Sequence, residues 1–166
     1  SAYEIGTAIR MQDGWLYAAA KLPKAGVLMR MQPDGSGMNE VLDVAGGEIT
    51  DLAFAPDGTL WMTTIEADGG KLCRVSNDQW GVTVEPVVTQ IDGKALSCPA
   101  AVAVGADGKV YFTNAADVSV KYGLESALRT ELLAHTATGW VYVYDPVTRA
   151  VERVLGGVAG ASGLAL

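Results

Sequence analysis

Apolar and polar residues along the chain repeat one pattern three times. An apolar stretch is followed by an Asp-Gly turn and then by a strand rich in aromatic and β-branched residues. The three copies are TAIRMQDGWLYAAA from Thr7, DLAFAPDGTLWMTT from Asp51 and AVAVGADGKVYFTN from Ala101. Asp-Gly between two apolar strands is a strong short-range signal for a β-hairpin, because glycine adopts a positive φ at little cost. Each copy therefore predicts two antiparallel strands.

Two more strands are predicted after each hairpin. The third strands lie in GVLMRMQPDG, KLCRVSND and GWVYVYDP, and the fourth in NEVLDV, VEPVVTQ and AVERVL. The turn glycines Gly14, Gly58 and Gly108 are 44 and 50 residues apart. Four strands recurring at such a period are typical of β-propeller blades. An ordinary β-sandwich would not require the strand order and turn chemistry to recur.

The repeats predict one all-β domain of three four-stranded antiparallel blades. Between the second and third strands of the third repeat, apolar residues recur at spacings near 3.6, which predicts a helix near 118–134. The predicted units are blade 1 at about 7–50, blade 2 at about 51–100, blade 3 at about 101–160, and the start of a fourth inner strand at 162–166, within a single domain over 1–166.

Residues 111–166 closely resemble the strictosidine synthase-like proteins, in which a YFTD-type strand precedes a helical insertion and a TGRLLRYDP-type strand. Here the matching runs are YFTN, TGWVYVYDP and GLAL. The earlier blades are similar to those of that group and of its gluconolactonase and regucalcin relatives. The resemblance implies the N-terminal half of a six-bladed β-propeller with a small-molecule pocket at one end of its channel. Since three blades cannot close a ring, we expect a homodimer that completes six blades, or a fragment of a longer chain.

The metal-dependent relatives hold a cation, usually calcium, on the channel axis. Aligned on the alanines Ala8, Ala53, Ala103 and Ala165, the ligand positions here are Ile5 or Gly6, Thr50, Ala100 and Ser162. None is a carboxylate, whereas calcium requires several oxygen ligands. We therefore expect no metal and no cofactor, and keep calcium as the alternative.

Composition narrows the partners and the compartment. The chain has 12 Lys and Arg against 19 Asp and Glu, and a net charge of −7 disfavours nucleic acid and anionic lipid surfaces. No apolar run reaches the roughly 18 residues that span a bilayer, and because Ser1 is not followed by a charged region and an apolar segment, we expect no signal peptide in this chain. A soluble protein of undetermined compartment is expected. Cys73 and Cys98 are expected to be buried thiols rather than a disulfide.

Candidate site residues follow from where propeller strands begin. Inner strands start near the axis, so the pattern places Thr50, Asp51, Cys98 and Ser162 at the channel mouth. Asn114 and Tyr122 would form the wall above the mouth and complete the predicted ligand-binding set. Candidates for an acid or base, chosen by elimination, are Glu66, Asp117 and His135.

The hypothesis is a metal-free, small-molecule-binding propeller unit that takes an apolar or amine-bearing ligand at an acidic channel mouth. Two alternatives stay open: a calcium-dependent hydrolase of lactones or esters, and a protein-interaction module. If the chain is an enzyme, the resemblance implies either that hydrolase or a strictosidine synthase-like lyase.

Overall fold

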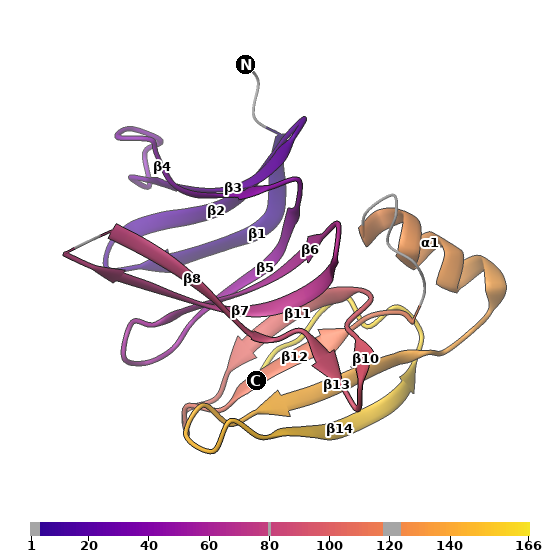
Figure 1. Cartoon of the computed structure of the whole chain (residues 1–166). Helices are drawn as coiled ribbons and strands as arrows, with labels where there is room; N and C mark the ends of the chain where they lie inside the picture. Colours follow the sequence, from indigo (N-terminus) through magenta and orange to yellow (C-terminus); the bar gives the residue numbers. More distant parts are fainter. Residues whose placement is uncertain (1–3, 80, 118–123) are drawn as a thin grey trace.

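The part of the chain that the structure describes folds into three four-stranded antiparallel sheets, a two-stranded hairpin and one helix (Figure 1). The structure is a computed structural model that describes residues 4–79, 81–117 and 124–166. In each large sheet the strands lie in chain order, so strands consecutive in sequence are neighbours. This confirms the predicted all-β architecture of propeller blades. Within the described ranges, no helix is both long enough and apolar enough to cross a bilayer.

Each blade runs from an inner strand to an outer strand. Blade 1 consists of β1 (Glu4–Gln12), β2 (Trp15–Leu22), β3 (Ala25–Met31) and β4 (Asn39–Ala45). Blade 2 consists of β5 (Glu48–Phe54), β6 (Leu60–Glu66), β7 (Gly69–Asp78) and β8 (Gly81–Val88). Blade 3 consists of β11 (Pro99–Val104), β12 (Val110–Asn114), β13 (Gly139–Tyr144) and β14 (Val151–Val158).

The Asp-Gly pairs form turns, as the repeat predicts. In blade 1, Gln12 pairs with Trp15 across a two-residue turn in which Asp13 and Gly14 have φ values of 50° and 78°. The turn of blade 2 is longer: Gly58, at φ 85°, donates from its amide to the Ala55 carbonyl at 2.9 Å. Residues with a side chain rarely adopt the φ values of Gly14 and Gly58, which is why glycine occupies these two positions.

Two elements modify the blades. The helix α1 (Leu124–Ala134) confirms the later part of the helix expected over 118–134, whereas residues 118–123 lie outside the described part of the chain. A short hairpin of β9 (Gln90–Ile91) and β10 (Lys94–Ala95) joins blade 2 to blade 3 and was not predicted. Residues 161–166 form no strand here, so the fourth inner strand stays a prediction.

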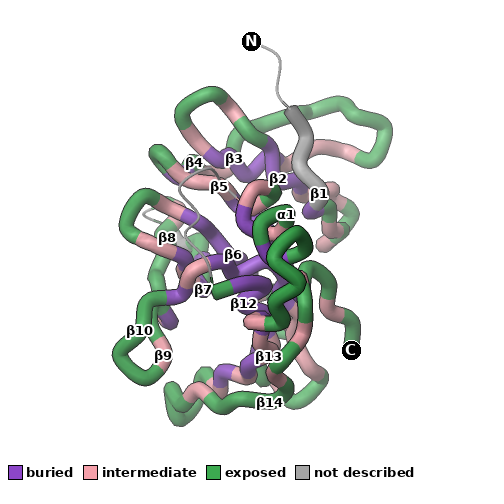
Figure 2. The backbone as a smooth tube through the Cα atoms, turned by 90° about the vertical axis from the view of Figure 1, so that its right-hand side faces the viewer, coloured by how far each residue is buried: buried purple, intermediate pink, exposed green. Residues whose placement is uncertain are grey.

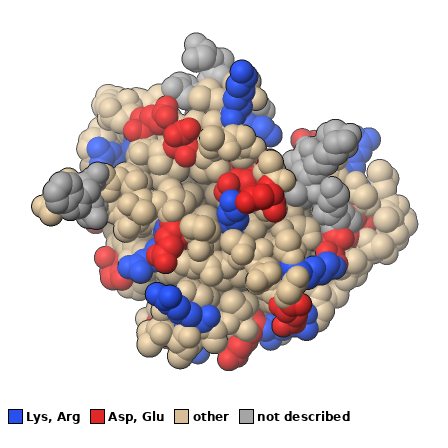
Figure 3. Space-filling view, viewed as in Figure 1, with Lys and Arg blue, Asp and Glu red and all other residues tan. Residues whose placement is uncertain are grey.

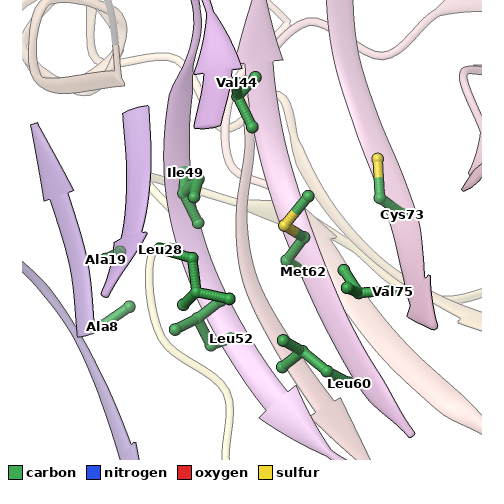
Figure 4. Close-up of a cluster of buried hydrophobic side chains, with 10 residues drawn as sticks. All are labelled: Ala8, Ala19, Leu28, Val44, Ile49, Leu52, Leu60, Met62, Cys73 and Val75. Atoms are coloured by element: carbon green, nitrogen blue, oxygen red, sulfur yellow. The ribbon is translucent and has the colours of Figure 1, made fainter. Parts of the chain in front are cut away.

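The core lies between the blade faces. Leu28 of blade 1 packs with Leu52 and Met62 of blade 2 (Figure 4), and Trp61 of blade 2 packs with Phe112 of blade 3. The two cysteines are buried free thiols, as expected. Burial raises the pKa of the Cys73 thiol to about 11 and that of Cys98 to about 12, which keeps both thiols protonated.

One carboxylate ties the three inner strands together. Asp51, on β5, accepts a hydrogen bond from Arg10 Nη2 of β1 at 2.9 Å through Oδ1 and one from the Val102 amide of β11 at 3.0 Å through Oδ2. Its Oδ1 also accepts from the Leu52 amide at 2.8 Å. The residue follows a register shift in β5 that begins at Ile49. The Asp51 carboxylate therefore links all three blades at their inner strands.

We predict that Asp51→Asn lowers the free energy of unfolding by about 3 kcal/mol, because the amide nitrogen must face the Arg10 or Val102 donor and the charge is lost. Urea denaturation measures this. Asp57→Asn, at an exposed carboxylate in a turn, is the matched control and should change stability by no more than about 0.5 kcal/mol. Equal losses of stability in the two variants would contradict the role of the Asp51 hydrogen bonds to Arg10 and Val102, which we call the Asp51 clasp.

Candidate functional site

Three of the candidates at the starts of the inner strands, Thr50, Asp51 and Cys98, already bond or pack against other groups of the protein. The Thr50 hydroxyl lies 2.8 Å from Thr63 Oγ1 and 2.9 Å from the Pro99 carbonyl oxygen, so it joins β5 to β11. Asp51 forms the clasp described above, and Cys98 is fully buried. Ser162 is exposed in the irregular C-terminal segment. These four residues do not form a common ligand surface in the described structure.

The other candidates lie apart from one another. Glu66 accepts hydrogen bonds from Lys71 Nζ at 2.7 Å and from the Thr64 hydroxyl at 3.0 Å, and this carboxylate raises the pKa of Lys71. His135 is exposed just after α1, with a φ of 51°. Tyr122 lies outside the described residues, so its predicted role stays a prediction.

Asn114 and Asp117 do come together, at a cavity of about 320 Å³ that we call the hairpin pocket. Its walls are the β9–β10 hairpin and the blade 3 strands β12, β13 and β14; Figure 2 shows the hairpin opposite β13 and β14. The volume suits a small molecule. The pocket lies between the hairpin and β12–β14 of blade 3, whereas the predicted site was at the starts of the inner strands.

Asp117 is fixed at one side of the hairpin pocket by groups from three segments. Its carboxylate accepts hydrogen bonds from Lys94 Nζ and from Ser97 Oγ, the latter at 3.0 Å, and its amide donates to Thr138 Oγ1 at 2.8 Å. The bond from Lys94 is the main reason that the pKa of Asp117 lies below its usual range. The side chain is therefore an anionic hydrogen-bond acceptor at neutral pH. Asn114, beside it, accepts from the Cys98 amide at 2.7 Å.

Aromatic side chains from β13 form the opposite wall. Trp140 and Tyr142 are stacked with their ring centroids 6.3 Å apart, and the Arg153 guanidinium lies 5.0 Å from the Trp140 centroid. Arg153 Nη2 also bonds Asp92 at 2.8 Å across the pocket. The pocket thus combines ring surface with two ion pairs. On the face seen in Figure 3, charged side chains likewise lie in small groups of mixed sign.

Behind this site, a fully buried carboxylate fastens the helix. Glu131 of α1 accepts hydrogen bonds from the Thr138 amide at 2.6 Å, the Thr138 hydroxyl at 2.9 Å and the Thr136 hydroxyl at 2.7 Å. Burial alone would raise the pKa of Glu131, but these bonds outweigh it and hold the value below the usual range. Because Thr138 also accepts from the Asp117 amide, Glu131 indirectly positions Asp117.

The axial positions do not fit a calcium ion. Thr50 already bonds other groups, Ala100 carries no side-chain oxygen, and Ser162 is exposed away from regular structure. Among the side chains that the structure describes, no three His, Cys, Asp or Glu residues converge as ligands would. No step of the function proposed below passes through a metal.

Comparisons with known proteins find the fold but no family. No protein-family model matches, and no curated protein matches the sequence. A gluconolactonase from Xanthomonas campestris superposes with a TM-score of 0.59 at 16% identity over 93% of this chain, and a chain of a nidogen/laminin complex with 0.58 at 14% over 92%. This chain spans 48% of each. Virginiamycin B lyase from Staphylococcus aureus gives 0.51 at 14% identity, over 89% of this chain and 40% of that one.

At such identities the similarity shows the propeller fold alone, and the chain covers about half the length of these structures. The expected half-propeller and the link to gluconolactonase relatives are supported at the level of the fold. The resemblance to strictosidine synthase-like proteins stays a prediction.

The sequence analysis missed Lys94, Trp140 and Arg153. The Asp92-Gly93 pair, with φ values of 52° and 79°, is the same hairpin signal that located the blades and would have found the Lys94 hairpin. Trp140 pairs with Gly156, and Arg153 pairs with Tyr142. This register brings Arg153 over the Trp140 ring, and no local motif reveals it.

We predict that Glu131→Gln lowers the free energy of unfolding by about 2 kcal/mol, since an amide cannot accept all three hydrogen bonds. In the unfolded chain Glu131 has the ordinary glutamate pKa of about 4.3, and in the folded protein its pKa is lower. The stabilisation by its carboxylate is therefore fully present above about pH 4.3 and is lost as the pH falls through the folded-state pKa. Urea titrations at neutral and acidic pH should show the difference between wild type and variant shrinking in acid. Exposed Glu125→Gln on the same helix is the control, with a change of about 0.5 kcal/mol; a similar loss in both variants would count against the anchoring role.

Proposed function

We propose that this propeller unit binds a small, neutral, hydroxylated ring compound, such as a sugar or a sugar lactone, in the hairpin pocket. The observation that carries the proposal is a cavity of about 320 Å³ that brings an ionised carboxylate and two cationic side chains together with stacked aromatic rings. Hydroxyl groups of such a ligand would donate to Asp117 and accept from Lys94 or Arg153. Its C–H faces would pack against Trp140.

The charges in the hairpin pocket favour a neutral ligand. Lys94 is paired with Asp117 and Arg153 with Asp92, so neither sign of charge is in excess. A charged ligand would have to break one of these pairs, whereas hydroxyl groups can join them as additional donors and acceptors. We therefore propose a hydroxylated ligand in place of the expected apolar or amine-bearing one.

Asp117 is better suited to binding than to proton transfer. A general base works best when its pKa lies near the operating pH, and Lys94 moves the pKa of Asp117 in the opposite direction. Hydrolysis of a lactone or ester is the second candidate, supported by the fold similarity to a gluconolactonase and by the carboxylate in the pocket. In that reaction water would lose a proton to Asp117 as its oxygen joins the carbonyl carbon; the C–O bond then breaks, and the leaving oxygen takes a proton.

We expect D-glucose and the γ-lactone of galactonic acid to bind with dissociation constants on the order of millimolar, measured by calorimetry and by the Trp140 indole N–H signal in NMR spectra. Asp117→Asn should weaken binding roughly tenfold, because a charge-assisted acceptor is lost. Glu85→Gln, at an exposed site on β8, is the control. Binding that is unchanged in Asp117→Asn would contradict the proposed site, and lactone turnover that this variant abolishes would favour the hydrolase.

The open face of blade 1 requires a partner blade. Ile9, Leu52 and Val102 occupy equivalent positions on the inner strands of the three blades. Each pairs with the matching residue of the second strand, which is Ala18, Met62 or Phe112 respectively. Leu52 and Val102 are 0% and 1% exposed because a preceding blade covers them, whereas Ile9 is 50% exposed. A second copy of this chain would supply the missing cover, and further blades of a longer chain would do the same.

Light scattering distinguishes a second copy of this chain from further blades of a longer chain as the partner that covers Ile9. We predict a solution mass of about twice 17.3 kDa for the 166-residue chain, and a monomer for Ile9→Lys, which places a charge on the open face. Arg129→Gln, at an exposed helix position, should leave the dimer intact. A stable monomer of the unsubstituted chain would contradict self-association and favour the longer chain.

A further inference from the structure

A second cavity, larger than the hairpin pocket, lies between blades 1 and 2. We call it the blade 1–2 wedge; its volume is about 560 Å³, and its walls come from β3 and β4 on one side and from the β5–β6 turn, β7 and β8 on the other. Apolar side chains that the main core leaves partly covered form its floor, among them Val41 and Val82. Tyr17 and Phe54 meet there edge to face, with ring centroids 5.0 Å apart. The floor can therefore accept an apolar ring.

Arg30 lines this wedge and has an unmet hydrogen-bonding capacity. Its Nε is buried without a hydrogen-bond partner among the described residues, and its guanidinium lies 4.5 Å from the centroid of the Trp15 ring. Arg10 and Arg153 each bond a carboxylate instead. A buried donor without an acceptor costs free energy comparable to a lost hydrogen bond, and because Arg30 lines the cavity, its guanidinium is a donor for an acceptor bound there.

Arg74 is the equivalent residue of blade 2, since it pairs with Trp61 as Arg30 pairs with Tyr17. It lies near Asp57, whose pKa is held low first by hydrogen bonds from Thr59 and then by the charge of Arg74. Arg74 therefore has a carboxylate nearby within the protein, whereas no described residue supplies an acceptor to Arg30 Nε.

The acidic residues of the wedge limit what that acceptor can be. Asp57 accepts from the Thr59 amide at 2.9 Å within its own turn, and Asp13 and Glu40 are exposed at the rim. Their negative charges repel a dianion such as phosphate more strongly than a single carboxylate. The apolar floor equally disfavours a small, fully hydrated anion.

We propose that the blade 1–2 wedge binds a monocarboxylate carried on an aromatic or other apolar ring. The carboxylate accepts hydrogen bonds from the Arg30 guanidinium, which stays stacked on Trp15, and the ring packs on Tyr17 and Phe54. This site is separate from the hairpin pocket, which belongs to blade 3 and the β9–β10 hairpin, and it does not depend on the function proposed for that pocket.

NMR titration of the ¹⁵N-labelled full chain with benzoate tests the proposal. Benzoate should shift the Arg30 Nε–Hε signal and the Tyr17 and Phe54 ring signals along one saturating curve. Acetate, which lacks the ring, and benzyl alcohol, which lacks the charge, should each bind roughly tenfold more weakly or worse. An Arg30 signal that benzoate leaves unmoved would overturn the proposal, as would equal affinity for acetate or for benzyl alcohol.

Three variants complete the test. Arg30→Gln should weaken benzoate binding at least roughly tenfold, while Arg129→Gln, on the exposed side of α1, should leave it unchanged. Arg153→Gln, which alters the hairpin pocket, should also leave benzoate binding unchanged. Wild-type affinity in Arg30→Gln, or a loss in Arg153→Gln, would show that benzoate binds elsewhere. The wild-type Arg30 signal keeps the proposal testable even if Arg30→Gln fails to fold.

Discussion

The Asp51 carboxylate is the interaction on which the arrangement of the three blades depends. It occupies the middle blade, where its two oxygens reach β1 on one side and β11 on the other. Asp51 directly precedes Leu52. The residues that directly precede the equivalent Ile9 and Val102 are Ala8 and Ala101, so the inner strands of the two flanking blades carry alanine at the position of Asp51. One ionised group, satisfied by an arginine and two backbone amides, thus draws three inner strands together. Such a group is stable when buried because every bond to it is made.

This convergence brings polar side chains together at the starts of the inner strands. Inner strands that are drawn together by Asp51 and by the contacts of Thr50 leave their polar side chains engaged with one another. The outer strands diverge, and the space between neighbouring blades widens toward the flank. Both cavities discussed above lie in such spaces, one beside blade 3 and one between blades 1 and 2. In each, an arginine lies over a tryptophan ring, which places a hydrogen-bond donor beside an apolar surface.

The strand order could be predicted because each blade is a series of hairpins, whose pairing is local in sequence. The register of the inner strands against the second strands could not be predicted. Alignment on alanines places Ala8 with Ala53 and Ala103. In the structure, however, Arg10 is the equivalent of Ala53, because Arg10 pairs with Tyr17 and Ala53 pairs with Trp61 at the matching position of the second strand. The two-residue turn of blade 1 and a longer bulge in β1 cause this offset. The hairpin pocket could not be predicted for a related reason: Asp117 was a candidate, but its partner Lys94 lies on a separate hairpin, and Glu131 becomes a buried anchor only through the packing of α1.

The proposed ligand sites lie between the outer parts of the blades and not at the starts of the inner strands. A crystal structure of the protein soaked with the γ-lactone of galactonic acid tests this most directly. Ligand density is expected between Trp140 and the Lys94–Asp117 pair, with the Thr50 and Asp51 hydrogen bonds intact. Density at the axis beside Thr50 and Ser162, with an empty hairpin pocket, would contradict it.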